Sequence, residues 1–343
     1  MTQGSERHGE GQKVEEQETP NQRCGVVAVL GAPNAGKSTF VNHMVGAKVS
    51  IVTHKVQTTR ARVRGVAMED STQIIYVDTP GIFTPRRKLD RAMVDAAWEG
   101  IEGADRVMLL IDAPAYLANA TDGASAASRR SAEDTDTIIE GLRRQGRRAD
   151  LVLNKIDRMP RPPLLTLAET LNKENVFDET FMISAQKGLG IDQLREHLIA
   201  QMPEGPYLYP EDQLSDITER LMAAEVTREK LFLRLHQEIP YSLTVETETW
   251  TRTKKGELRI EQVIFVERES QRALILGQKG RTISAVGKAS REDLSELLGE
   301  TVHLFLFVKV RENWAEEAER LREMGLGGML TRLDTERRSH GMD

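Results

Sequence analysis

Residues 31–38, Gly-Ala-Pro-Asn-Ala-Gly-Lys-Ser, have the composition and spacing of a phosphate-binding loop. The glycines allow backbone N–H groups to surround a phosphate at the positive end of the following helix. Lys37 is expected to bring positive charge to the β- and γ-phosphates, and the Ser38 hydroxyl to ligate Mg²⁺. The expected nucleotide contacts in this loop are Gly31, Asn34, Ala35, Gly36, Lys37, Ser38 and Thr39.

A second motif, Asp78-Thr79-Pro80-Gly81, follows the apolar run at 74–77. Asp78 is expected to hold the Mg²⁺ shell, and the Gly81 N–H to sense a γ-phosphate. Ile82 follows, where a glutamine could have oriented the attacking water, so we expect slow unaided hydrolysis or another means of stabilising charge.

A threonine between these two motifs would complete the Mg²⁺ shell of a nucleotide switch. Residues 56–60, Val-Gln-Thr-Thr-Arg, offer Thr58 as the first choice and Thr59 as the alternative, because spacing alone does not separate them.

The motif Asn154-Lys155-Ile156-Asp157, after the apolar run 151–153, predicts the base. Guanine presents N1–H and an exocyclic amine side by side, and the Asp157 carboxylate can accept both hydrogen bonds. Adenine would leave that charge unpaired. Asn154 would hold the loop, Lys155 would pack over the base, and Ser184-Ala185 would offer a backbone N–H to guanine O6. The motifs in chain order therefore predict a site that binds and hydrolyses GTP.

These motifs need an alternating framework to position them. Short apolar runs alternate with helical patterns between residues 23 and 203, which favours an α/β fold with a mostly parallel sheet covered on both faces. The expected strands are 25–30, 62–67, 73–77, 106–111, 151–153 and 181–183, and the expected helices are 37–46, 90–103, 132–145, 163–172 and 191–201.

The composition of the chain limits the classes of protein to which it can belong, and two of its segments lack a helix or strand pattern. A net charge of −6 over 343 residues excludes a uniformly basic nucleic-acid binder, and the single Cys24 cannot form an internal disulfide, which fits a reducing compartment. No run approaches the roughly 18 apolar residues needed to cross a bilayer, so a cytoplasmic protein is expected. We expect a disordered tail at 1–22 and a solvated polar insertion without secondary structure at 113–131.

The pattern changes after a proline-rich linker at 204–212. The order α-β-β-α-α-β is expected over 213–312, with helices at 213–237 and 282–298, strands at 242–250, 258–267 and 302–310, and a short apolar segment at 273–276. A last helix is expected at 314–324, within a C-terminal region of 313–343 that ends in a mobile tail.

This second region contains a Gly-x-x-Gly turn, and in a type II KH domain such a loop clamps an RNA backbone. The turn alone is weak, because 100–103 and 325–328 also fit it. The α-β-β-α-α-β order and a local basic cluster strengthen the interpretation. The expected RNA contacts are Arg272, Gly277, Gln278, Lys279, Gly280, Arg281 and Lys288.

Taken together, residues 25–326 resemble the Era family of bacterial GTPases, which assist assembly of the small ribosomal subunit. The nucleotide motifs carry this resemblance together with the linker 206–210, Arg228-Glu-Lys230, Ile239-Pro-Tyr241 and the run 266–271 before the Gly-x-x-Gly turn. The resemblance implies a monomeric protein that binds GTP and GDP, the 3′ end of 16S rRNA and the small subunit. It also implies peripheral contact with the inner membrane.

The resemblance also suggests how the site could work without the glutamine. Relatives with asparagine at the position of Asn34 can place a potassium ion there, which would stabilise charge. The expected catalytic set is therefore Lys37, Thr58, Asp78, Gly81 and Asn34, with Mg²⁺ as cofactor and K⁺ as a hypothesis. The alternative is an RNA-binding chaperone whose nucleotide domain hydrolyses only weakly.

Overall fold

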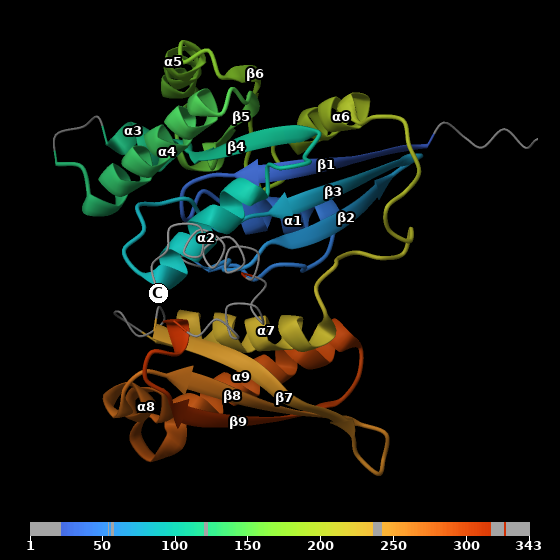
Figure 1. Ribbon diagram of the computed structural model, residues 1–343, viewed down its shortest axis with the longest axis vertical. Coiled ribbons are helices and arrows are strands. Elements are labelled where there is room, and N and C mark those ends of the chain that lie inside the picture. The colour runs from blue at the N-terminus through green and yellow to red at the C-terminus, as the bar shows by residue number, and fades with distance from the viewer. Residues whose placement is uncertain are drawn as a thin grey trace, which may run out of the picture.

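The computed structural model describes residues 22–53, 55, 58–119, 123–235, 242–316 and 326 (Figure 1). The first domain alternates strands with helices, as its apolar runs predict. Its strands are β1 (Arg23–Leu30), β2 (Val63–Glu69), β3 (Thr72–Asp78), β4 (Arg106–Asp112), β5 (Ala149–Asn154) and β6 (Phe177–Met182). Its helices are α1 (Lys37–Val45), α2 (Lys88–Glu99), α3 (Ala113–Ala118), α4 (Ala126–Arg144), α5 (Arg161–Asn172) and α6 (Ile191–Gln201), with the 3-10 turn η1 (Ile156–Arg158).

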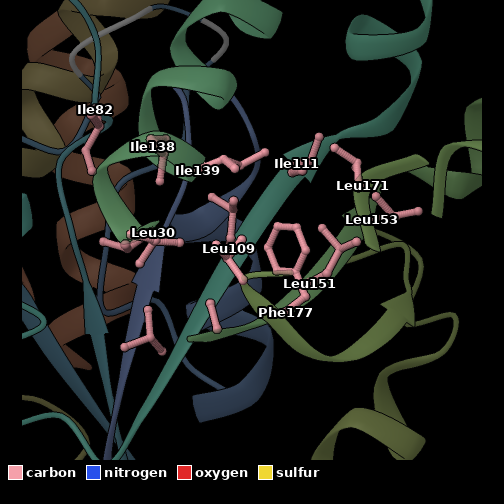
Figure 2. Close-up of a cluster of buried hydrophobic side chains, with 14 of the residues drawn as sticks. Leu30, Ile82, Leu109, Ile111, Ile138, Ile139, Leu151, Leu153, Leu171 and Phe177 are labelled. Carbon is pink, nitrogen blue, oxygen red and sulfur yellow. The ribbon is translucent and has the colours of Figure 1, made fainter. Parts of the chain in front are cut away.

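Within the described residues, these strands form one sheet of order β2-β3-β1-β4-β5-β6, in which only β2 runs antiparallel to its neighbour. One buried cluster packs α1 and α6 against one face of the sheet. Another packs α2, α4 and α5 against the other face, and Figure 2 shows its side chains around Leu109 and Leu151. The predicted α/β fold with both faces covered is confirmed. It brings the carboxyl ends of β1, β3, β4 and β5 to one edge.

The prediction of a polar stretch without secondary structure at 113–131 is wrong, because α3 and the first turn of α4 lie there. Side-chain caps begin both helices: Asp112 accepts the Ala115 N–H at 3.1 Å, and Ser125 accepts the Ser128 N–H at 3.0 Å. The polar composition that indicated a loop belongs to capping residues and an exposed helix face. Residues 120–122 lie outside the described part of the chain.

The linker lies along the first domain. Gln73 accepts the Leu208 and Tyr209 N–H groups at 2.9 and 3.0 Å, and Val66 N–H donates to Leu214 O at 2.8 Å. Residues 213–218 are therefore extended against β2. The helix predicted from 213 begins only at α7 (Glu219–Arg234), where the Thr218 hydroxyl accepts the Leu221 N–H.

The second domain has the predicted order α-β-β-α-α-β, which is confirmed. Strand β8 pairs antiparallel with β7 and parallel with β9, and α7 and α9 cover one face of this sheet. The remaining elements are β7 (Leu243–Arg252), β8 (Leu258–Val266), α8 (Glu269–Leu276), η3 (Gln278–Gly280), α9 (Arg281–Leu298) and β9 (Val302–Val310).

The chain returns to the first domain after β9. The 3-10 turn η4 (Trp314–Glu316) places Trp314 against α2, where Leu326 also packs. The rest of the helix predicted at 314–324, the tail at 327–343 and the tail at 1–21 lie outside the described residues. Among the helices that are described, none has the length and apolar character needed to span a membrane.

Candidate nucleotide and RNA sites

The loop between β1 and α1 closes tightly on its own lysine. Lys37 is buried, and its Nζ donates to Gly31 O at 3.0 Å and Ala32 O at 3.1 Å. Gly36 has φ 100°, and a Cβ there would lie 2.4 Å from Asn154 Nδ2. Glycine is required at this position both by the backbone conformation and by the close approach of the guanine-motif loop. These contacts within the protein give the loop a defined shape.

Oxygen atoms from three segments meet beside this loop. Thr59 Oγ1 lies 2.8 Å from Ser38 Oγ and donates to Asp78 Oδ2 at 3.3 Å. Asp78 is fully buried, and its Oδ1 has no hydrogen-bond partner among the described residues. Burial raises the pKa of Asp78, while the positive charge of Lys37 opposes this. An orphaned buried carboxylate oxygen with two hydroxyls suits Mg²⁺, which prefers oxygen ligands and takes the rest from phosphates and water.

The first-choice threonine, Thr58, lies away from this oxygen cluster. Thr58 Oγ1 lies 2.6 Å from Thr53 Oγ1 and donates to Lys55 O at 2.7 Å, so it belongs to the outer wall of the cavity. The alternative, Thr59, places its hydroxyl at the oxygen cluster. This segment contacts the second domain through Thr58 O and Arg60, on either side of Thr59, before the chain continues into β2.

Of the second motif, only Gly81 borders the cavity. Thr79 is fully buried and donates to Val29 O at 2.7 Å, so its hydroxyl is directed to β1. A Cβ on Gly81 would lie 2.9 Å from Pro33, which keeps this backbone against the phosphate loop. Ile82 is buried in the hydrophobic core and its N–H donates to Gly31 O at 3.2 Å. The residue at the missing glutamine's position is therefore directed away from the cavity.

The guanine-motif side chains tie three loops together. Asn154 Nδ2 donates to Ala35 O at 2.8 Å, and Asn154 Oδ1 accepts the Ala185 N–H at 3.0 Å. Ser184 Oγ donates to Asp157 Oδ1 at 2.6 Å, which orients the carboxylate at the cavity. The Ala185 N–H predicted for guanine O6 is thus engaged by Asn154, and the Ser184 N–H by Leu189 O.

Asp112 was missed by the sequence interpretation. It ends β4, and its Oδ2 accepts a hydrogen bond from Lys155 Nζ at 2.6 Å. Lys155 also donates to Asn34 O at 2.7 Å and has φ 66°. This lysine is consequently fixed along the cavity wall. The signal was available, because Asp112 follows an apolar strand, as Asp78 and Asn154 do.

The Gly-x-x-Gly turn of the second domain does not line the nucleotide cavity. Gly277 has φ 70°, and a Cβ there would lie 2.1 Å from Thr282 Oγ1, whereas Gly280 has open space around its missing Cβ. The basic cluster is partly neutralised: Arg272 pairs with Glu269, and Lys288 pairs with Glu292 at 3.8 Å. The Arg281 guanidinium donates to Gln278 Oε1. Lys279, at φ 54°, forms no ion pair with another described residue and lies within the turn.

A phosphate-binding loop, a buried oxygen cluster and a guanine-type motif at one sheet edge define a P-loop GTPase domain. A KH domain follows it. The first domain matches the family model for 50S ribosome-binding GTPases over residues 26–173, and the second matches the KH domain model over residues 238–315.

Whole-chain comparisons agree with this description. GTPase Era of Caulobacter vibrioides is 55% identical over 90% of this chain and 98% of the relative, and GTPase Era of Brucella suis is 54% identical over 91% and 96%. The chain belongs to the Era family of GTPases.

Solved structures of that family have the same two-domain arrangement. A variant of Aquifex aeolicus Era bound to GDP and AlF4⁻ has a TM-score of 0.80 at 35% identity, covering 89% of this chain and 99% of that one. Era in complex with MgGDPNP and nucleotides 1506–1542 of 16S ribosomal RNA has a TM-score of 0.79 at 36% identity, with the same coverage.

Proposed function

We propose that this GTPase is a switch that binds the 3′ end of 16S rRNA through its KH domain and assists assembly and maturation of the small ribosomal subunit. The observation that carries the proposal is the presence, on one chain, of a shaped guanine-nucleotide cavity and a Gly-x-x-Gly turn. The similarity to the Era complex with MgGDPNP and 16S rRNA supports this pairing. GTP turnover measured with and without a 16S 3′-end oligonucleotide tests it, and RNA-dependent turnover is expected.

Residues around the cavity are proposed to bind the phosphates and the Mg²⁺ of the nucleotide. Backbone N–H groups of the phosphate loop receive the phosphates, with Lys37 supplying charge, and Gly81 marks the γ-phosphate end. Bound Mg²⁺ would neutralise charge between the β- and γ-phosphates, held by Ser38 and Thr59 with Asp78 in its shell. Among the described residues, no group of three or more His, Cys, Asp or Glu side chains is placed to hold a metal ion.

Nucleotide affinity is expected to depend on Lys37 protonation. Burial lowers the pKa of Lys37 to about 8, with Asp78 opposing that shift, and only the charged form attracts phosphate. GDP affinity should fall by about eightfold between pH 7.5 and pH 9, as Lys37 of the free protein loses its proton. Titration of a fluorescent GDP analogue at the two pH values measures this. Lys37→Arg keeps its charge and should lose the pH dependence, whereas a pH-independent wild type would contradict the assignment.

A potassium ion at Asn34 is the proposed substitute for the missing glutamine. Asn34 is exposed at the rim of the cavity, where its amide oxygen can coordinate a cation next to the phosphates. Hydrolysis is expected to be about tenfold faster in potassium than in sodium buffer, and Asn34→Ala should remove the difference. Equal rates in the two buffers for the unmodified protein would refute this proposal.

The KH turn is the proposed RNA contact, and Lys279 its principal cation. Replacing Lys279 by alanine should weaken RNA binding uniformly across sequences and reduce the slope of log K against log salt by about 0.7, as expected for one lost phosphate contact on a single strand. Lys254→Ala, in the turn between β7 and β8, is the matched control. An unchanged salt slope in Lys279→Ala would remove Lys279 from the interface.

The alternative, an RNA chaperone with a weakly hydrolysing nucleotide domain, is disfavoured by the arrangement of Lys37, Ser38 and Asp78. Absence of GTP turnover under RNA-saturating conditions would favour it. A cytoplasmic location stays a prediction from the sequence, and peripheral contact with the inner membrane and a monomeric state stay predictions from the family resemblance. Fractionation and sedimentation would test them.

A further inference from the structure

The segment that carries Thr59 is held by the KH domain on both sides. Thr58 O accepts a hydrogen bond from Arg228 Nη2 on α7. Arg60 Nη1 donates to Leu243 O, at the start of β7, at 2.7 Å. Thr59 lies between these two anchors, and its hydroxyl contacts Ser38 and Asp78 of the first domain. The position of its hydroxyl is therefore set from the second domain as well as the first.

Both arginines are buried at this junction. Only 3% of Arg60 and 1% of Arg228 is exposed, and Glu225 pairs with the Arg228 guanidinium. The Arg60 guanidinium lies 5.7 Å from the centre of the Trp314 ring, close enough for a cation–π contact. Because both arginines are buried, their hydrogen bonds to Leu243 O and Thr58 O are shielded from water and are stronger than the same bonds would be on the surface.

Trp314 extends the junction to the helix that follows Gly81. It is fully buried, packs against Leu89 and Met93 of α2, and donates through Nε1 to Ser242 O at 3.1 Å. One side chain thereby contacts the segment after Thr59, the helix after the second nucleotide motif and the KH domain.

A third anchor fixes the beginning of the same segment. Glu229 of α7 accepts the Val52 N–H at 2.8 Å and pairs with Lys48 at 2.7 Å. Glu229 is 5% exposed, so its charge needs these partners. Neighbouring residues of α7, Arg228 and Glu229, therefore hold the two ends of the stretch that borders the nucleotide cavity.

We infer that the KH domain is a positioning element of the GTPase site, and that Arg228, by holding Thr58 O, keeps the Thr59 hydroxyl at the Mg²⁺ position. This inference rests on the proposed role of Thr59.

The test uses the full chain and compares Arg228→Ala with Arg220→Ala. Arg220 lies on the same helix and donates to Thr247 O and Glu248 O, both within the KH domain. Arg228→Ala should raise the Mg²⁺ concentration for half-maximal GTP hydrolysis by about tenfold and leave GDP affinity within about twofold. Arg220→Ala should match the unmodified protein in both. An unchanged Mg²⁺ requirement in Arg228→Ala would overturn the inference.

Two further variants separate positioning from loss of folding. Arg228→Lys keeps one donor for Thr58 O and should recover part of the Mg²⁺ response, even if Arg228→Ala does not fold. On a Thr59→Ala background the Arg228 substitution should add less than about twofold, because its effect passes through Thr59. Additive effects would instead show a general structural role and overturn the inference.

Failure of the proposed function can be recognised independently. If the unmodified protein does not hydrolyse GTP, the Mg²⁺ dependence of binding a non-hydrolysable GTP analogue replaces turnover as the readout. A shift for Arg228→Ala and none for Arg220→Ala would still support the positioning role. Equal Mg²⁺ dependence in the two variants would overturn it.

Discussion

Replacing Asp157 by asparagine is expected to convert the nucleotide preference from guanosine to xanthosine triphosphate. The carboxylate is proposed to accept two hydrogen bonds, from guanine N1–H and the exocyclic amine. Its orientation at the cavity is fixed by Ser184 Oγ at 2.6 Å. An asparagine offers one oxygen and an NH2 group, and the NH2 would face the guanine amine donor to donor. Xanthine has a carbonyl oxygen at that position, which accepts from the NH2.

GTP affinity should fall by about a thousandfold in Asp157→Asn, because two charge-assisted hydrogen bonds are worth about 3–6 kcal/mol together. Competition of GTP and XTP against a fluorescent GDP analogue measures both changes. Asp192→Asn, with the same substitution at an exposed position of α6, is the control and should keep the GTP preference. Unchanged GTP affinity in Asp157→Asn would refute the assignment of this carboxylate.

Thr59→Ala is expected to lower the maximal GTP hydrolysis rate by about 10²- to 10³-fold, the usual effect of removing one group that stabilises transition-state charge. The Thr59 hydroxyl lies 2.8 Å from Ser38 Oγ and donates to Asp78 Oδ2, and the other oxygen of that carboxylate has no partner among the described residues. Its loss removes an oxygen ligand where Mg²⁺ would meet the γ-phosphate. GDP binding should change little, because GDP lacks that phosphate.

Thr58→Ala is the matched control for this experiment. Its hydroxyl bonds Lys55 O and Thr53 Oγ1 at the cavity wall, so hydrolysis should stay within about threefold of the unmodified rate. Single-turnover kinetics at saturating Mg²⁺ separate chemistry from product release. A larger loss in Thr58→Ala than in Thr59→Ala would restore the sequence-based first choice and contradict the geometry described here.

Features governed by local chemistry could be predicted from the sequence. The phosphate loop needs Gly36 for its backbone conformation, and the residues that end β3 and β5 lie at the sheet edge because parallel strands finish there. The order of elements in the KH domain follows from short apolar runs in the same way. In each case the determining residues are neighbours along the chain.

Features governed by distant contacts could not be predicted in this way. The choice between Thr58 and Thr59 depends on hydrogen bonds to α7 and β7, about 170–180 residues away. Residues 213–218 are extended because Leu214 O pairs with Val66 N–H, which no local propensity records. The caps of α3 and α4 were visible as Asp112 and Ser125, but an exposed polar helix was mistaken for a loop.

Crosslinking followed by sequencing of the bound RNA tests most directly whether the nucleotide controls binding to ribosomal RNA. The protein is incubated with total RNA in GTP, with a non-hydrolysable analogue in parallel, and in GDP. Fragments from the 3′ end of 16S rRNA should dominate and be enriched in the triphosphate samples, and Lys279→Ala should reduce their recovery. Absence of 16S 3′-end fragments in both nucleotide states would contradict the proposed function.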